Sequence, residues 1–144
     1  MRTVEDLYQA SLKLDIPYLV GLSLALSGDR YLEIQKEQMF DGEREDGTPI
    51  FNTRTGSEYY SPSYARYKGK DSPIDLKDTG AFYGGMFTRQ ESEGLLVDSD
   101  DHKSDMLKEV YEPFLLNEQS KIEFMPFANQ ILIDEAVKGL NGGL

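Results

Sequence analysis

The chain has 144 residues, of which 39% are hydrophobic and 28% are charged, and its formal net charge at pH 7 is −11. This length and composition predict one domain over residues 1–144 with a hydrophobic core, rather than a disordered chain. The negative charge argues against nucleic-acid binding through a broad basic face, and the absence of cysteine excludes disulfides, thiolate metal sites and cysteine nucleophiles. The most apolar segment, residues 16–28, is too short to span a bilayer, and the sequence starts without a signal-peptide pattern, so we expect no membrane partner.

The N-terminal third is predicted to be helical. Thr3 is a suitable N-cap for a first helix, and Pro17 suits the first turn of a second. Asp29 is the predicted N-cap of a third helix, and Asp41-Gly42 is predicted to end it.

Residues 41–72 are rich in Gly, Pro, Ser, Asp and Tyr, which predicts a long irregular loop or arm. Loops of this length within a domain are usually functional or disordered. A short helix is expected within it, with Ser61 as cap and Pro62 at the first helical position. Large aromatic side chains gain from contact with another surface, so the loop tyrosines are candidate subunit-interface residues. They are Tyr59, Tyr60, Tyr64 and Tyr67.

The segment DSPIDLKDTGAFYGGMF, residues 71–87, combines turn residues with aromatics and paired glycines. Side chains of the Asp-Thr-Gly triplet can bond to backbone N–H groups just ahead, and its glycine allows a positive φ. We expect this turn to lead into a strand over residues 81–90, which the paired glycines would bend, bulge or open to another backbone. The predicted turn and scaffold residues are Pro73, Asp78, Thr79, Gly80, Gly84 and Gly85.

Residues 93–100 predict a second strand, antiparallel to the first, with a turn near residues 91–94. A helix is expected to open in residues 98–116, with acidic residues at its N-terminal end, and to end or kink at Pro113.

The last segment, residues 124–140, predicts an amphipathic helix that starts at Pro126 and ends at Gly139 or at the Gly142-Gly143 pair. The fold class predicted from these elements is α+β, with a helical N-terminal third, a long loop, a small antiparallel β-sheet and a C-terminal amphipathic helix.

The acidic stretch at residues 98–109 has the spacing of a calcium loop in part. Asp98, Asp100 and His102 stand at the first, third and fifth positions and Glu109 at the twelfth, but Lys103 stands where the loop needs glycine. We interpret the stretch as an acidic helix N-terminus, and we expect no metal and no cofactor.

No coherent catalytic set is present in the sequence. His102 is the only histidine, and no GxSxG elbow accompanies it. Asp78-Thr79-Gly80 has the form of the aspartic-protease triplet, but such a site needs two copies, and Lys77 precedes it where an apolar residue is expected. The glycines have neither the P-loop nor the GxGxxG order. We therefore expect a non-enzymatic protein.

The middle third of the chain resembles the tail-completion and virion-morphogenesis proteins of tailed bacteriophages, also called head–tail joining or neck proteins. In that family a DG loop and a Ser/Thr-Tyr-Lys stretch precede a PL-x-DTG-x-L-x-x-S segment. Pro73-Ile74 and Asp78-Thr79-Gly80 stand in the corresponding places here, with Phe82 in place of leucine and Gly85 in place of serine. The resemblance covers residues 41–87, while Lys77, the paired glycines and the C-terminal third depart from it.

The resemblance implies a virion structural protein that is made in the host cytoplasm and assembles as a homo-oligomeric ring of six or twelve copies at the neck or tail. Portal, adaptor or tail-tube proteins would be its partners, and DNA would pass through the ring lumen only as cargo. The tyrosine loop would become ordered on assembly, and the negative charge would keep DNA from adhering. The alternative is a small acidic binding module, or a DNA-mimic inhibitor, that covers a basic partner surface.

Overall fold

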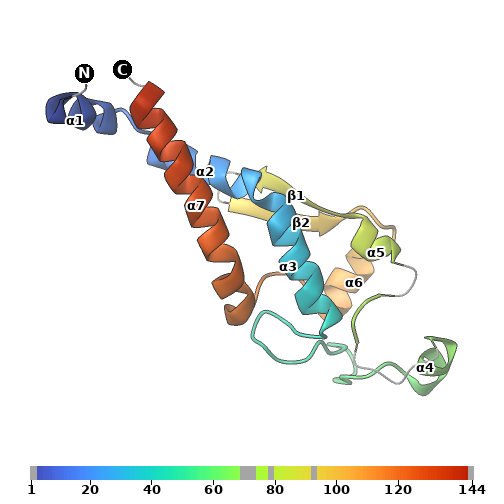
Figure 1. Cartoon of the computed structure of the whole chain (residues 1–144). Coiled ribbons are helices and arrows are strands. Elements are labelled where there is room, and N and C mark those ends of the chain that lie inside the picture. Colours follow the sequence, from blue (N-terminus) through green and yellow to red (C-terminus); the bar gives the residue numbers. More distant parts are fainter. Residues whose placement is uncertain (1–2, 69–73, 78–79, 92–93, 143–144) are drawn as a thin grey trace.

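The computed structural model describes residues 3–68, 74–77, 80–91 and 94–142 (Figure 1). It confirms the predicted α+β class, with a helical N-terminal third, a long loop, a small antiparallel sheet and a C-terminal helix. The elements are α1 (Val4–Leu12), α2 (Ile16–Leu26), α3 (Gly28–Phe40), α4 (Pro62–Lys68), α5 (Ala81–Gly84), β1 (Met86–Glu91), β2 (Gly94–Ser99), α6 (Ser104–Tyr111) and α7 (Glu118–Gly142).

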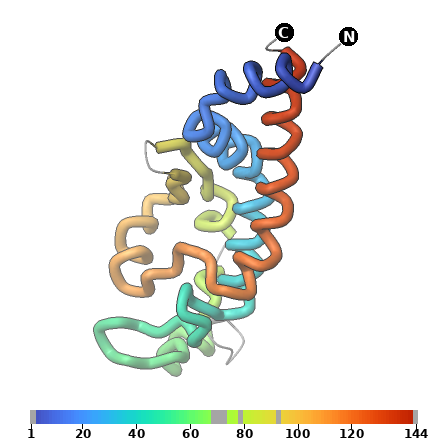
Figure 2. The backbone as a smooth tube through the Cα atoms, turned by 90° about the vertical axis from the view of Figure 1, so that its left-hand side faces the viewer, coloured from blue at the N-terminus to red at the C-terminus, as the bar shows by residue number. Residues whose placement is uncertain are grey.

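The elements form layers around the α2–α3 pair. Helix α7 packs on α2 and α3 from one side, and the β1–β2 hairpin packs on them from the other (Figures 1 and 2). Helix α1 lies at the end of the molecule where the N- and C-termini meet, whereas the loop and α4 lie at the opposite end.

The first two helix starts follow the sequence prediction. Thr3 accepts from the Asp6 N–H at 3.1 Å while its own N–H donates to the Asp6 carboxylate at 2.9 Å, a reciprocal capping box. Pro17 lies in the first turn of α2, which Asp15 caps through the Tyr18 N–H at 3.1 Å.

The predicted N-cap of α3 is wrong. Ser27 both ends α2 and precedes α3, so Asp29 lies inside the first turn of α3. The hydroxyl of Ser27 donates to the Ser23 carbonyl at 2.6 Å and is not available as a cap. The chain therefore passes from α2 to α3 without an intervening loop, and no residue is left in which a carboxylate could act as the N-cap. The predicted end at Asp41-Gly42 is confirmed, with Asp41 as C-cap and Gly42 at a φ of 79°.

Two glycines let the helices approach the hairpin closely. A Cβ on Gly28 would overlap the Thr88 hydroxyl of β1, and a Cβ on Gly21 would overlap the Gln90 side-chain amide. Because glycine has no side chain at these two positions, the α2–α3 layer can lie this close to the sheet.

The predicted strand over residues 81–90 is wrong in its first half. Residues Ala81–Gly84 form the helical turn α5, closed by hydrogen bonds from Gly84 N–H to Gly80 C=O at 2.8 Å and from Gly85 N–H to Ala81 C=O at 2.9 Å. Gly80 has a φ of 88°, so the chain enters α5 from the left-handed region, and the strand starts only at Met86.

The antiparallel pairing of the two strands is confirmed. Its register runs from Met86 opposite Ser99 to Glu91 opposite Gly94. The predicted turn falls on residues 92–93, which lie outside the described residues.

The helix predicted to open in residues 98–116 begins later, because Asp98 and Ser99 belong to β2. Helix α6 starts at Ser104, and Glu112 ends it with a φ of 47° just before Pro113. The prediction that Pro113 terminates this helix is confirmed.

Pro126 does not start the C-terminal helix; it lies inside α7. The cap is Asn117, whose side-chain oxygen accepts from the Ser120 N–H at 2.9 Å. A proline inside a helix removes one backbone hydrogen bond. Phe124 and Ala128 are buried on either side of it, and their packing keeps the helix continuous through this position. Helix α7 also passes through Gly139 and runs to Gly142, one of the two predicted ends.

The core consists of two adjoining clusters that share Tyr31 as a partly buried neighbour. The ring of Tyr31 packs edge-on against Phe124 at 5.3 Å, and burial, with a smaller effect of Glu45, raises the pKa of Tyr31 to about 12. Ile50 of the long loop is fully buried in the larger cluster, so this loop contributes to the core. The larger cluster is Met39, Ile50, Ile74, Leu76, Phe82, Met86 and Val97, and the smaller one is Ile34, Leu116, Phe124 and Ala128.

Candidate functional site

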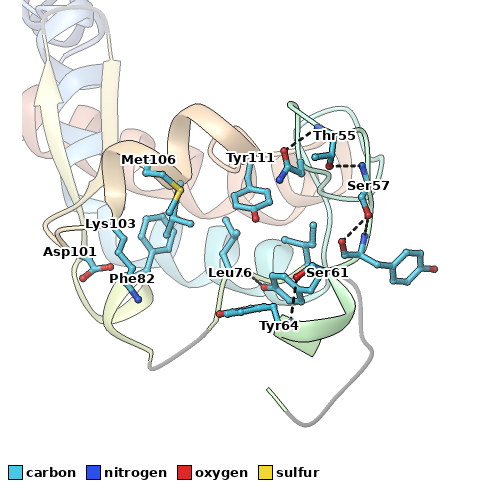
Figure 3. A pocket seen from close by; sticks show the side chains of 15 residues that line it. Thr55, Ser57, Ser61, Tyr64, Leu76, Phe82, Asp101, Lys103, Met106 and Tyr111 are labelled. Atoms are coloured by element: carbon cyan, nitrogen blue, oxygen red, sulfur yellow. Dashed lines mark hydrogen bonds between the residues drawn. The ribbon is translucent and has the colours of Figure 1, made fainter. Parts of the chain in front are cut away.

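A partly open cavity of about 490 Å³ lies between the long loop, α5 and α6 (Figure 3). Most of its lining is aromatic or apolar, and Asp101 and Lys103 contribute the charged groups. We call it the aromatic groove and define it by Tyr60, Tyr64, Leu76, Phe82, Met106 and Tyr111. Its volume is in the range of cavities that bind ligands or side chains of a partner.

The loop tyrosines do not share one environment. Tyr60 and Tyr64 are partly buried, with ring centroids 4.9 Å apart, and both line the groove. Tyr67 continues the row at 6.0 Å from Tyr64 but is 76% exposed. Tyr59 is 56% exposed and lines the groove from the loop. The structure thus places three of the four predicted tyrosines at the groove and the fourth beside it.

A partly buried hydrogen-bond network lies at the floor of the groove. The Tyr60 hydroxyl accepts from the backbone N–H groups of Leu76 at 3.0 Å and Asp75 at 3.3 Å, and lies 3.2 Å from the Asp75 carboxylate. The Tyr83 hydroxyl donates to the Asp75 carbonyl. Burial is the main cause that raises the pKa of both tyrosines. The network fixes Leu76 at a φ of 60°, which is unusual for leucine.

The sequence interpretation missed Asp75 and Tyr83. The sequence contained a signal for Asp75, because this residue stands between the apolar residues Ile74 and Leu76. In the structure Asp75 is 3% exposed, like these two neighbours. A carboxylate flanked by core residues must find hydrogen-bond partners in the fold.

The described part of the long loop is already folded in the single chain, which differs from the expectation that it orders on assembly. Thr53 donates to the Val110 carbonyl at the end of α6 from its N–H at 2.9 Å and from its hydroxyl at 2.7 Å. Arg44 forms an ion pair with Glu112 at 2.7 Å. These contacts, together with buried Ile50, hold the loop against α6.

The described turn and scaffold residues gather at α5. A Cβ on Gly85 would overlap the Asp100 carboxylate and approach the Ser99 hydroxyl to 3.0 Å, so Gly85 lets α5 lie against the end of β2. The Ser99 hydroxyl donates to the Phe82 carbonyl at 2.8 Å and joins the two elements. Gly84 faces open space. Pro73, Asp78 and Thr79 lie outside the described residues.

The calcium-loop acids do not converge. Asp98 pairs with Lys108 at 2.9 Å and accepts from the Ser104 hydroxyl at 3.1 Å, whereas Glu109 pairs with Arg54 at 3.3 Å. Burial acts to raise the pKa of Asp98, but the ammonium and the hydrogen bonds outweigh it and lower the pKa. The described residues contain no group of three acids or histidines that could hold a metal ion, and Asp100 is exposed.

His102 is an exposed side chain just before the start of α6. Its side chain is 85% exposed, and Nδ1 lies 3.2 Å from the Asp101 carboxylate. Asp101 lines the aromatic groove, whereas the imidazole extends to solvent.

A second candidate surface covers the three helices α1, α2 and α7. Among the described residues, thirteen of the eighteen exposed large hydrophobic side chains belong to these helices. In α1, apolar side chains recur at intervals of three, one and four residues, which places them on one helix face. We call this set the α1 apolar face: Val4, Leu7, Tyr8 and Leu12, which are 85%, 41%, 55% and 62% exposed.

Helix α7 carries a similar outer stripe. Ile122, Ile133 and Val137 are 65%, 55% and 48% exposed, while the inward side holds Phe124 and Ala128. None of the described helices combines the length and the hydropathy that crossing a bilayer requires. Exposed apolar surfaces of this kind mark interaction sites.

Comparisons of the chain with protein-family models, with curated proteins and with solved structures found no match.

Proposed function

We propose that this chain is a non-enzymatic structural protein of a tailed phage virion, which assembles as an oligomeric ring at the neck or tail. The observation that carries the proposal is the exposed apolar surface of α1, α2 and α7. Single exposed apolar residues are ordinary, but a helix face with four of them together marks an interaction site. Burial of this surface between copies would supply the free energy of assembly.

The tyrosine loop supports the same proposal. Tyr59 is exposed on the loop whose Thr53 bonds to the Val110 carbonyl, and Tyr67 is exposed on the short helix α4, so both side chains are accessible to a neighbouring subunit. Tyrosine is enriched at the centre of protein interfaces. The resemblance of residues 41–87 to neck proteins supplies the identification of the assembly as a virion.

The chemistry of the groove region supports a role without catalysis. Asp98 and Glu109 are each paired with a basic side chain, and His102 extends to solvent. In the proposed ring, portal, adaptor or tail-tube proteins would be the neighbours and DNA would be cargo in the lumen. A net charge of −11 suits a lumen to which phosphates do not adhere.

The acidic binding module remains a second candidate, and the net charge of −11 favours it. Such a module would cover a basic surface, as a DNA mimic does. It gives no role to the α1 apolar face, whose four side chains are exposed and uncharged.

The two candidates differ in where the protein is found. Mass spectrometry of purified particles, separated into heads and tails, should detect the chain in the tail or neck fraction at a fixed copy number. An inhibitor or module would be absent from particles and free in the host cytoplasm. Absence from particles, or turnover of a substrate by the purified chain, would overturn the proposal.

A further inference from the structure

The solvent side of α7 is uncharged and largely apolar, whereas the outer side of a surface helix is normally polar. Helix α7 runs along one edge of the molecule (Figure 2), and its inward side is buried at Ser120, Phe124 and Ala128. On the opposite side, by the helical period of 3.6 residues, lie six exposed residues that we call the α7 outer face. They are Ile122, Pro126, Asn129, Gln130, Ile133 and Val137.

The residues of the α7 outer face have the same spacing from either end of the helix. The steps from Ile122 to Val137 are four, three, one, three and four residues, which centre the set between Asn129 and Gln130. Apolar residues occupy both arms, and two side-chain amides occupy the centre. When two copies of this face are antiparallel about a two-fold axis, apolar residues lie opposite apolar residues and amides lie opposite amides. This self-complementarity is the property of an isologous interface.

We infer that the α7 outer face binds the same face of a second copy, with the two helices antiparallel. Ile122 of one copy then lies at the level of Val137 of the other, and Pro126 lies at the level of Ile133. The central amides each carry donors and an acceptor, so they can pair with one another across the axis. A polar amide within an apolar helix seam favours one register over the others.

The distribution of charge favours this contact over other parts of the surface. The chain carries a net charge of −11, so its copies repel one another. Residues 124–133, the middle of the proposed contact, contain no charged side chain. The charged residues of α7 lie on both sides of this segment, where Lys121 pairs with Glu118 and Lys138 pairs with Glu135. Two copies can therefore meet along the middle of α7 without a charge in the seam.

The available area indicates a reversible dimer. Ile122, Ile133 and Val137 are 65%, 55% and 48% exposed, and Met125 beside them is 47% exposed. With Pro126 and the amides they offer on the order of 400 Å² per copy, about half of the roughly 800 Å² per partner of a standard interface. Contacts of this size are characteristic of weak, transient complexes.

An isologous contact closes with two copies, so the proposed ring needs a further contact through another surface, such as the α1 apolar face. The inference rests on the self-association in the proposed function and is independent of a location in the virion.

The absence of cysteine from the chain permits a cross-linking test. Ile122→Cys and Val137→Cys variants, each with a single thiol, are mixed and treated with a short bismaleimide. Both positions are exposed in the single chain, so both variants should fold. We expect a cross-linked dimer in the mixture and little in either variant alone, because equivalent positions of antiparallel copies lie about 22 Å apart along the helix axis. Parallel helices would give the opposite result.

Two controls accompany the mixture. Ser63→Cys, at an exposed position of α4, is mixed with Val137→Cys and measures cross-linking by random collision. Ile133→Asp, introduced into both cysteine variants, places a charge in the seam and should reduce the cross-linked fraction at least tenfold, whereas Ile133→Leu should retain it. Circular dichroism confirms that each variant is folded.

The inference is overturned if the mixture cross-links no more than the Ser63→Cys control, if each variant alone reacts as well as the mixture, or if Ile133→Asp has no effect. Flotation of the chain with phosphatidylcholine vesicles, without a cross-link, would assign the face to a lipid surface and also overturn it. If the chain is present in particles and the Ile122–Val137 pair does not react, the proposed function stands and the α7 contact does not. If the pair reacts and the chain is absent from particles, the α7 contact stands and the proposed virion function does not.

Discussion

The hydroxyl of Tyr60, a partly buried side chain, accepts from the backbone N–H groups of two buried residues. A Tyr60→Phe substitution keeps the ring and leaves the N–H groups of Asp75 and Leu76 without this acceptor. An unsatisfied buried donor costs about 1–3 kcal/mol. We expect Tyr60→Phe to lower the free energy of unfolding in urea by an amount in this range. Tyr59→Phe, at an exposed tyrosine next in sequence, is the control and should change it little. Equal losses in the two variants would contradict the role assigned to the network.

Asp98 gives stability a defined pH dependence. Its pKa in the folded chain is lowered, so its stabilising effect is present above the ordinary carboxyl pKa of about 3.9 and is lost as the pH falls through the lowered value. We expect Asp98→Asn to destabilise the chain at pH 7 by about 0.5–1 kcal/mol, a small figure because the side chains of Asp98 and Lys108 are 27% and 33% exposed.

The measurement for Asp98 is a series of thermal unfolding experiments from pH 7 to pH 2.5. The difference between wild type and Asp98→Asn should shrink below about pH 4. Glu123→Gln removes the same charge from an exposed position of α7 and should show no such convergence. A difference that stays constant over the whole series would refute the role of the Asp98–Lys108 pair.

At the residue scale, sequence patterns identify chemistry but not partners. Tyr60 and Tyr64 are predicted as candidate subunit-interface residues because large aromatics gain from contact, and within the single chain both line the groove. The pattern does not distinguish them from Tyr67, which is exposed, because the distinction depends on Leu76 and Phe82 from other segments. The calcium-loop spacing could not reveal that Asp98 faces Lys108 on the next element.

Among the elements, the contact between α3 and β1 depends on Gly28. An alanine there gains helix propensity but brings its Cβ into the Thr88 hydroxyl. Rotation of the threonine relieves the overlap at the expense of its preferred rotamer, so we expect Gly28→Ala to destabilise the chain by about 1 kcal/mol. Gly21→Ala should cost less, because the atom it meets is the end of the flexible Gln90 side chain.

The double variant Gly28→Ala with Thr88→Ala tests this cause. Truncation of Thr88 leaves only its Cβ near the new methyl group, at 3.5 Å, which is ordinary contact. The double variant should therefore be more stable than the sum of the two single changes predicts, as measured by urea unfolding. Strict additivity would mean that the overlap with Thr88 is not what limits position 28.

Element boundaries show where local patterns stop being informative. The sequence analysis predicts a strand directly after the turn at Gly80, but the left-handed glycine directs the chain into the turn of α5 first. Pro126 was predicted to start the last helix, because proline favours the first turn. The packing of Phe124 and Ala128 extends the helix on both sides of it, and this contribution comes from α2 and α3 rather than from nearby sequence.

Across the whole molecule, the fold class followed from element order and the exposed surfaces did not. The periodicity of α1 is that of a helix with one apolar side, and such a helix normally covers a core. Here Ala10 alone of its residues is buried, while the α1 apolar face remains exposed. A sequence pattern predicts that an apolar face will be covered, but it does not tell whether the same chain or another copy covers it.

Ionic strength separates the two candidate functions. Copies with a net charge of −11 repel one another, so salt that screens this repulsion should strengthen self-association driven by apolar burial. Binding of an acidic module to a basic partner should instead weaken as salt rises. We expect sedimentation velocity to show a larger associated fraction at 500 mM than at 50 mM sodium chloride. This increase in salt shortens the screening length from roughly 14 Å to roughly 4 Å. Leu12→Asp adds charge and removes apolar area on α1, so it should reduce association at both salt concentrations. Association that falls with added salt would favour the acidic module and count against an assembly held by the apolar helices.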